Sequence, residues 1–380
     1  MSAYISTEDF QLAKGKYDEK NPGASYTLNA QCYTDQKYFD AEREAIFFRS
    51  WQLVCHIEKV SEPGAYYVAD IQGRSIAVVR DRNGDLRAFY NVCKHRAHHL
   101  LVGEGKARVM TCPYHAWSYN LDGKLRQAPQ TDALENFDKG EICLDQVRVE
   151  EFCGFIYVNL DANAKSLAEQ SGSLAEEINK FAPDISELTF ARRLTFDIKS
   201  NWKNVVDNFL ECYHCPTAHK DFCSLLKFET YKVTTHGIYS SHMAKGGNAN
   251  NTAYSVEGAT CDDHAVWWLW PNTCLLRYPG RANFLVLTII PVGPDRTIET
   301  YDFYFETAEP TPQEEEAIAY VRDVLQQEDI DLVESVQRGM NTPAFQSGRI
   351  VNDPAGSGLS EHALHHFHGL LLDAYKSIVK

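Results

Sequence analysis

The chain has 380 residues, of which 44% are hydrophobic and 23% charged, so it has room for two domains and a substantial core. Its formal net charge of −15 argues against binding to nucleic acid or to an anionic membrane surface. No apolar run reaches membrane-spanning length, and residues 1–20 lack the hydrophobic segment of a signal peptide, which predicts a cytoplasmic protein without a membrane partner. In that compartment the eleven cysteines are not expected to form a disulfide framework.

The first part of the chain predicts an N-terminal segment followed by a small all-β domain. An amphipathic helix is expected over 35–51, because apolar residues alternate there with charged ones at helical spacing. Short β-rich runs follow, and Asn83-Gly84 and Asp122-Gly123 are turn signals between them. The predicted strands are 51–56, 65–71, 75–80, 86–91, 107–111, 116–119, 147–149 and 154–159. We therefore assign 1–44 to a segment that packs with the rest of the chain, and 45–158 to the all-β domain.

Two cysteine and histidine pairs lie in this all-β domain. Cys93 and His95 enclose one residue, and Cys112 and His115, further along the chain, enclose two. One interpretation is a structural zinc ion with two cysteine and two histidine ligands. The other is a Rieske [2Fe–2S] cluster, in which two cysteines hold one iron and two histidines hold the other. A zinc finger usually takes both cysteines from one knuckle, whereas here each loop supplies one residue of each kind, so the pattern favours the Rieske cluster.

The remainder, 159–380, predicts a larger domain in which helices cover an antiparallel sheet, which makes the chain α+β. Residues 161–172 have the composition of a linker. The predicted helices are 173–181, 314–340 and 360–378, and the predicted strands are 188–198, 265–276, 283–291 and 297–306. The last helix carries four histidines, for which we expect packing roles because the pattern offers no partnering acid beyond Glu361: His362, His365, His366 and His368.

The stretch 201–221 predicts a buried helix that Pro216 ends, with His219 on the turn after it. Its polar residues recur at steps of three or four and so share one face: Asn204, Asp207, Glu211 and His214. Burying such a stripe costs several kcal/mol per unpaired charge, so it needs a partner. A buried histidine more often only satisfies a hydrogen bond. Two histidines with carboxylates beneath them nevertheless suit the facial ligand set of non-haem iron(II).

With both motifs in place, the chain resembles the oxygenase (α) subunit of the Rieske non-haem iron oxygenases over essentially its whole length. The matching blocks are NVCKHR at 91–96, CPYHAW at 112–117 and NFLECYHCPTAH at 208–219. The family carries its third iron ligand as an aspartate on a late helix, and Asp329 occupies that place. The resemblance therefore implies His214, His219 and Asp329 as iron ligands. Ala97 departs from the pattern, because many relatives have glycine there, but the ligands are retained.

The resemblance also implies how electrons reach the iron. Subunits of this family form head-to-tail homotrimers, in which an acid bridges the cluster histidine of one chain and the iron histidine of the next. Glu211 occupies that position. Alternatively, Glu211 is an ordinary buried acid with a local partner. Asp207 is expected to orient a ligand histidine, and Asn204 is placed with these catalytic residues. No G-x-G-x-x-G follows a predicted strand, so a separate NAD(P)H-dependent flavin or iron–sulfur reductase is implied.

The substrate expectation rests on the blocks LECYHC, ESVQRGM and HHFH, which look closest to the branch acting on carnitine, choline and betaine. An aromatic cage holds such quaternary ammonium groups. The candidates, each of which could instead be core packing, are Phe209, Tyr239, Trp268, Trp270 and Tyr278. The predicted reaction is O₂-dependent hydroxylation beside the nitrogen, followed by C–N cleavage. Aromatic ring hydroxylation is the alternative within the family. Outside the enzymes, the alternative is an electron carrier or a zinc-stabilised binding protein.

Overall fold

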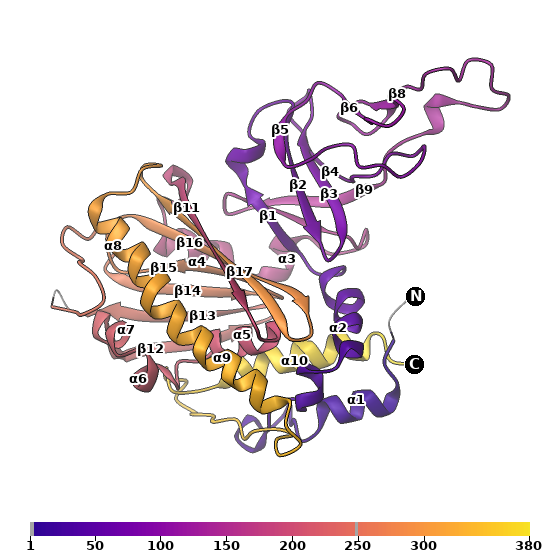
Figure 1. Ribbon diagram of the computed structural model, residues 1–380. Coiled ribbons are helices and arrows are strands. Elements are labelled where there is room, and N and C mark those ends of the chain that lie inside the picture. The colour runs from indigo at the N-terminus through magenta and orange to yellow at the C-terminus, as the bar shows by residue number, and fades with distance from the viewer. Residues whose placement is uncertain (1–3, 248–249) are drawn as a thin grey trace. The chain divides into compact units, whose positions relative to one another are not determined.

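The computed structural model describes residues 4–247 and 250–380. These divide into two compact units, one of which is Phe47–Glu169. The other unit joins the chain up to Ile46 with Gln170–Lys380, so the N-terminal segment packs with the C-terminal part. The fold is α+β, as predicted, with one unit built from two sheets of short strands and the other from one sheet of longer strands with helices (Figure 1).

The smaller unit is built on an antiparallel sheet of seven strands in the order β1-β10-β9-β4-β3-β2-β5. Their bounds are β1 (Gln52–His56), β2 (Ala65–Ile71), β3 (Arg74–Arg80), β4 (Leu86–Tyr90), β5 (Glu104–Lys106), β9 (Gln146–Phe152) and β10 (Phe155–Asn159). A second sheet has the order β6-β7-β8, formed by β6 (Met110–Thr111), β7 (Ser118–Tyr119) and β8 (Leu125–Gln127). Cys93 follows β4 and Cys112 follows β6, and both belong to one apolar core with Trp117 and Tyr119.

The larger unit is built on one antiparallel sheet of seven strands in the order β11-β17-β16-β15-β14-β13-β12. Their bounds are β11 (Thr189–Ile198), β12 (Leu226–His236), β13 (Tyr239–Gly246), β14 (Asp263–Leu269), β15 (Thr273–Arg277), β16 (Asn283–Gly293) and β17 (Arg296–Phe305). The sequence did not predict β12 and β13. It also predicted one strand over 265–276, which was wrong. Pro271 has no N–H to donate, and the chain turns there into the hairpin of β14 and β15.

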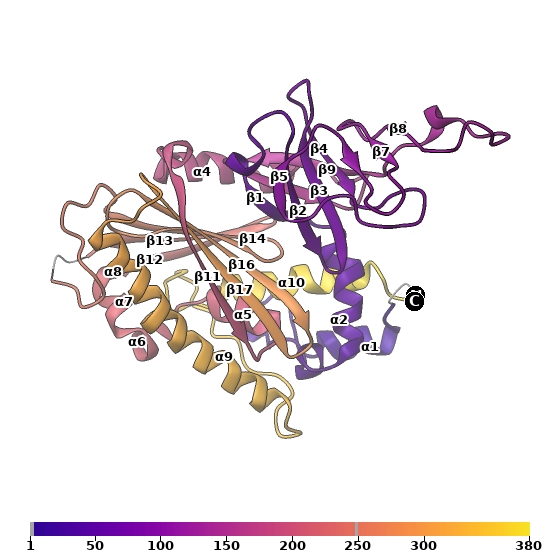
Figure 2. The ribbon, with the colours of Figure 1, turned by 45° about the horizontal axis from the view of Figure 1, so that its top comes forward.

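Helices accompany this sheet. They are α1 (Thr7–Lys14), α2 (Gln36–Glu42), α4 (Leu174–Phe181), α5 (Trp202–Phe209), α6 (Cys215–Ala218), α7 (Lys220–Leu225), α8 (Pro312–Tyr320), α9 (Gln326–Met340) and α10 (His362–Lys376). A short α3 (Leu167–Ser171) lies in the predicted linker. Helices α8 and α9 lie end to end along the sheet and are joined by a π-helical turn at Val321–Leu325 (Figures 1 and 2). Helix α5 contacts both α9 and β16, which brings the predicted iron-binding segments together.

The continuous helix predicted over 201–221 was wrong. Helix α5 ends at Phe209, and the chain runs without helix until α6 begins at Cys215. Glu211 causes the interruption, because its carboxylate accepts hydrogen bonds from the backbone N–H groups of Tyr213 and His214. Those N–H groups then have no need of a helical carbonyl. Pro216 does not end a helix, because it lies in the first turn of α6, where a missing N–H costs nothing.

Among the described residues, no helix is both long and apolar enough to cross a membrane.

Candidate active site

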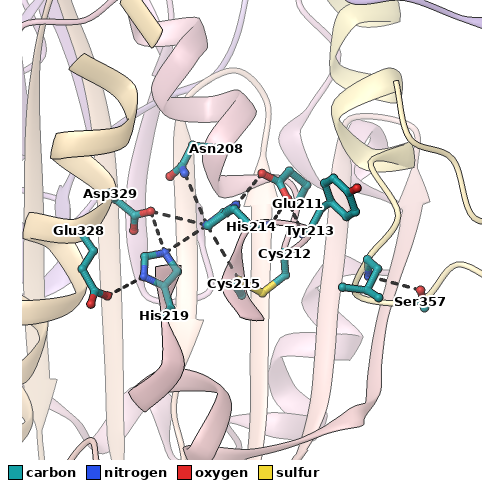
Figure 3. Close-up of a disulfide and its surroundings, with 11 residues drawn as sticks. Asn208, Glu211, Cys212, Tyr213, His214, Cys215, His219, Glu328, Asp329 and Ser357 are labelled. Atoms are coloured by element: carbon teal, nitrogen blue, oxygen red, sulfur yellow. Dashed lines mark hydrogen bonds and ion pairs between the residues drawn. A yellow bond between two sulfur atoms is a disulfide. The ribbon is translucent and has the colours of Figure 1, made fainter. Parts of the chain in front are cut away.

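Three side chains converge between α9 and the segment around α6. His214 immediately precedes α6, His219 links α6 to α7, and Asp329 lies in the first turn of α9. Their ligand atoms lie within 4.8 Å of one another. Nε2 of His214 is 3.1 Å from Nε2 of His219, which is 2.9 Å from Oδ1 of Asp329. Figure 3 shows the three side chains pointing toward a common centre.

A carboxylate holds the far side of each histidine ring. Nδ1 of His214 donates to Oε1 of Glu211 at 2.5 Å, and Nδ1 of His219 donates to Oε2 of Glu328 at 2.7 Å (Figure 3). Because each Nδ1 donates to a carboxylate, each Nε2 faces the common centre and is the nitrogen that can give its lone pair to a metal there. This is the tautomer that metal-binding histidines need. From the sequence, no role was predicted for Glu328.

The charges around His219 are acidic. Burial by itself lowers the pKa of this imidazole, but hydrogen bonds and charges from Asp329 and Glu328 outweigh burial and raise the pKa to about 9. The metal-free site therefore favours a cation, which is a proton when no metal is present.

A disulfide spans the two residues Tyr213 and His214, the second of which is a predicted metal ligand. Cys212 and Cys215 are bonded to each other on either side of Tyr213 and His214 (Figure 3). The other nine cysteines are free, so the expectation that no disulfide framework forms holds, but this local pair was not foreseen. Asn208, near the end of α5, is a second residue that the sequence missed. Its Nδ2 lies 3.5 Å from Nε2 of His214.

Asp207 is hydrogen-bonded to partners other than the two ligand histidines, so its predicted role of orienting one of them was wrong, and the catalytic role of Asn204 stays a prediction. Asp207 accepts hydrogen bonds from the hydroxyl of Tyr33 at 2.8 Å and from Nε2 of His368 at 2.9 Å. Asn204 is buried and donates to Ser200 and Gln337. Both residues tie α5 to neighbouring elements. The histidines of the last helix were expected to pack without a partnering acid. His368 is buried, as expected, but it has an acidic partner in Asp207.

A cavity adjoins the three converging side chains, and its walls carry several aromatic rings. Two of the predicted substrate residues, Phe209 and Tyr278, line it. The remaining aromatic lining residues, which were not predicted, are Phe222, Tyr231, His264 and Tyr301. Burial lowers the pKa of His264 to about 3, so this ring is a neutral aromatic wall.

Three predicted substrate residues lie elsewhere, and for them the alternative of core packing was right. His264, Val266 and Trp268 share one face of β14, but the cavity ends at Val266. Trp268 is fully buried against Phe367 of α10, with ring centroids 5.3 Å apart.

The other two of these residues also have partners outside the cavity. Trp270 packs on Trp268 and Phe367. Tyr239 pairs with Ser173 and donates to Glu177 at 2.8 Å.

One acidic residue in the cavity wall was missed. Glu299 lies on β17, is 2% exposed and shares its face of the strand with Tyr301. Its carboxylate accepts a hydrogen bond from the amide of Gln326. Burial and the nearby charge of Asp329 raise the pKa of Glu299 to about 8, although the Gln326 bond acts in the opposite direction. The alternation of residues along the predicted strand 297–306 could have identified Glu299, because the residues that follow it on the same face of the strand are apolar.

The predicted cluster residues lie on two similar loops of the smaller unit. Cys93 and Cys112 are 2% and 3% exposed, whereas His95 and His115 are exposed and their ring centroids lie 4.7 Å apart. The backbone N–H of Ala97 donates to the backbone carbonyl of Cys93, and that of Ala116 donates to the backbone carbonyl of Cys112. Two buried thiols beneath two exposed imidazoles match the two-sided ligand set of a Rieske cluster.

Ala97 and Ala116 close these loops with φ values of +58° and +56°. That left-handed conformation favours glycine. It explains in physical terms the glycine expected of many relatives at position 97.

Comparisons with known proteins bear on both units. Residues 50–138 match the family described as Rieske [2Fe-2S] domain, and residues 185–377 match the ring hydroxylating alpha subunit (catalytic domain). The chain is 41% identical over 358 residues to the carnitine monooxygenase oxygenase subunit of Escherichia coli (strain K12), covering 94% of this chain and 96% of that protein. The chain belongs to the Rieske non-haem iron oxygenases. This oxygenase is also 34% identical to the chloroplastic choline monooxygenase of Beta vulgaris, over 91% of this chain and 76% of that one.

Solved structures of related proteins agree with this family assignment. The oxygenase superposes on the crystal structure of a quaternary ammonium Rieske monooxygenase in complex with L-carnitine with a TM-score of 0.85 and 36% identity, covering 95% of this chain and 99% of that one. Naphthalene 1,2-dioxygenase from Rhodococcus sp. has a TM-score of 0.81 at 21% identity, which shows the shared fold.

As a family member, the oxygenase is an enzyme that uses a Rieske [2Fe–2S] cluster and a mononuclear iron. The converging side chains fit such an iron. On an octahedron with metal–ligand bonds of about 2.1 Å, neighbouring ligand atoms lie about 3 Å apart, close to the separations from His219. The alternative of an electron carrier or zinc-stabilised binding protein is excluded, because the chain carries the catalytic domain of the family.

Proposed function

We propose that this chain is the terminal oxygenase of a two-component system that oxygenates a quaternary ammonium compound, such as carnitine, a betaine or choline. The observation that carries the proposal is the aromatic and acidic cavity beside the three converging ligand side chains. The named relatives act on carnitine and choline, which supports the same substrate class. Aromatic ring hydroxylation, the alternative, calls for an apolar cavity, whereas this one contains a buried carboxylate.

The proposal assigns the site residues as follows. His214, His219 and Asp329 hold the iron, which when bound supplies open positions for activating O₂. Glu211 and Glu328 orient the two imidazoles through Nδ1. The four residues of the cluster loops hold the Rieske centre: Cys93, His95, Cys112 and His115. The balanced reaction consumes O₂, two electrons and two protons, and yields the hydroxylated substrate and water. Hydroxylation on a carbon attached to nitrogen then leads to C–N cleavage.

The partners belong to the same proposal. Two electrons per turnover come from NAD(P)H through a separate reductase. A homotrimer places the cluster of one subunit next to the iron of its neighbour, with Glu211 as the bridge. Inter-subunit electron transfer is named for a related quaternary ammonium monooxygenase of known structure. The cytoplasmic location stays a prediction from the sequence.

An activity panel tests the proposal. The purified oxygenase is incubated with a Rieske reductase, NADH, O₂ and a panel of carnitine, γ-butyrobetaine, choline, glycine betaine and aromatic acids, and products are identified by mass spectrometry. We expect an aldehyde and trimethylamine, or a hydroxylated cation, and about three irons per chain. Turnover of aromatic acids alone would overturn the substrate class, and a zinc-only metal content would overturn the enzyme.

A further inference from the structure

The cavity has an acidic lining with no basic counterpart. It is lined by three carboxylates, and the described lining residues include no lysine or arginine. Two of the carboxylates are already engaged, because Glu211 accepts from His214 and Asp329 belongs to the proposed ligand set. Glu299 is the third, and no other role accounts for it.

Glu299 sits where an anion is costly. Its side chain is 2% exposed, and among the described residues it forms no ion pair. The hydrogen bond it accepts comes from the uncharged amide of Gln326. A buried carboxylate without a countercharge is strongly disfavoured, whereas a ligand cation in the same cavity relieves that cost.

The other walls suit a cation that has no hydrogen to donate. Phe222, His264 and Tyr278 pack against one another, with ring centroids 5.3 Å apart for His264 and Tyr278 and 5.5 Å apart for Phe222 and His264. Tyr301 lines the cavity from the same face of β17 as Glu299. Aromatic faces attract quaternary ammonium groups through the ring quadrupole, and a neutral His264 adds no opposing charge.

We infer that Glu299 is the specificity-determining acid that binds the quaternary ammonium head group, with the aromatic walls around it. This inference rests on the proposed function and names the residue that selects the substrate class. Because the described lining offers no lysine or arginine, the cationic head group, not a substrate carboxylate, anchors the substrate in this cavity.

The test compares wild-type holoenzyme with Glu299→Gln, using tetramethylammonium as the probe in calorimetric titrations. Glutamine has the shape of glutamate and keeps an acceptor for Gln326, so in titrations above about pH 8, where Glu299 is ionised, only the charge is lost. We expect the Kd for tetramethylammonium to rise roughly tenfold to hundredfold. Affinity for the neutral tert-butyl analogue of choline should stay the same. Glu309→Gln, which removes an exposed charge soon after β17, is the matched control and should bind like wild type.

Two further readouts separate the possible failures. Iron content and the visible spectrum of the cluster should be unchanged in Glu299→Gln, and kcat/KM for the quaternary substrate should fall by the same factor as the affinity. Equal affinity for tetramethylammonium in the variant and wild type would overturn the inference, as would loss of iron from the variant. If wild type itself binds no quaternary cation, the proposed function fails together with the inference.

Discussion

Glu328 holds the ring of His219 from the side opposite Asp329. Oε2 of Glu328 accepts a hydrogen bond from Nδ1 at 2.7 Å, while Nε2 of the same ring lies 2.9 Å from Oδ1 of Asp329. Consecutive helical residues point about 100° apart, so two neighbours at the start of α9 reach the two nitrogens of one imidazole. Helix α9 therefore fixes both the ring orientation and the nitrogen offered to the metal.

Glu328→Gln should weaken iron binding without disturbing the cluster. An amide at this position is a poorer acceptor, so the ring loses both its orientation and part of its basicity. The expected loss is about tenfold to hundredfold in iron affinity, which is typical for the partners of metal ligands. Competition titrations with a chelator measure this. Asp331→Asn, on an exposed position of the same helix, is the control. Unchanged affinity in Glu328→Gln would refute the orienting role.

Asp329→Ala should abolish turnover and leave the cluster intact. The substitution removes a ligand from the predicted iron site beside the cavity. The cluster loops lie in the other compact unit and are not touched by it. We expect iron content to fall by about one per chain, with the visible Rieske spectrum unchanged. His214→Ala should behave in the same way. Loss of the cluster spectrum in either variant would contradict the division into two metal sites.

The cysteine and histidine candidates could be found because their information is local, whereas Asp329, 110 positions from His219, came only from the family resemblance. Cys93 with His95, Cys112 with His115, and His214 with His219 lie within a few positions of each other, and such spacings limit the chemistry. The partners of Asp207 could not be predicted in this way. Tyr33 and His368 lie 174 and 161 positions away from it, and no spacing rule links segments so distant. The sequence therefore assigned Asp207 to a ligand histidine.

The end of α5 was predicted wrongly for a different reason. Helical periodicity continues through His214, but the carboxylate of Glu211 takes the backbone N–H groups of Tyr213 and His214. A side chain that competes with the helix for N–H groups leaves no mark on the periodicity. The substrate aromatics show a third limit. Trp268 lies on the face of β14 that lines the cavity, but Phe367 of α10 packs against its ring. Only the tertiary packing reveals this contact.

Glu211→Gln should keep both metals and slow the electron transfer between them. Glutamine can still accept from Nδ1 of His214, yet it no longer carries the negative charge that holds the proton on that ring. We expect normal iron and cluster contents, normal reduction of the cluster by the reductase, and a large drop in single-turnover product formation. Stopped-flow reoxidation of the reduced cluster with substrate and O₂ measures the step directly. A wild-type reoxidation rate would exclude Glu211 from the route.

Iron binding to the metal-free oxygenase should strengthen as the pH rises. The pKa of His219 is raised to about 9, so its ring is protonated near neutral pH and the proton must leave before iron binds. Affinity should therefore increase about tenfold per pH unit from about pH 7 to about pH 9, and then level off. Anaerobic titrations across this range measure the slope. In Glu328→Gln the increase should level off at a lower pH, because one of the two acids that raise the pKa is gone. A flat profile in wild type would contradict the assignment.

Glu42→Leu should strongly destabilise the larger unit. The Glu42 carboxylate on α2 lies 2.6 Å from Nζ of Lys203, and both side chains are fully buried. It also accepts from Trp202 of α5 and Tyr375 of α10, so one carboxylate joins three helices. Removing it leaves the lysine buried and uncompensated, at a cost of about 3–5 kcal/mol.

Thermal unfolding followed by circular dichroism, compared at one scan rate, tests this prediction. Tyr375→Phe, which removes a single hydrogen bond, should cost about 1 kcal/mol. The double variant Glu42→Leu with Lys203→Met should recover most of the lost stability, because an apolar pair of similar size leaves no buried charge. If Glu42→Leu alone unfolds at the wild-type temperature, the carboxylate does not hold these helices together. If the double variant is no better than the single one, the loss comes from packing and not from the orphaned lysine.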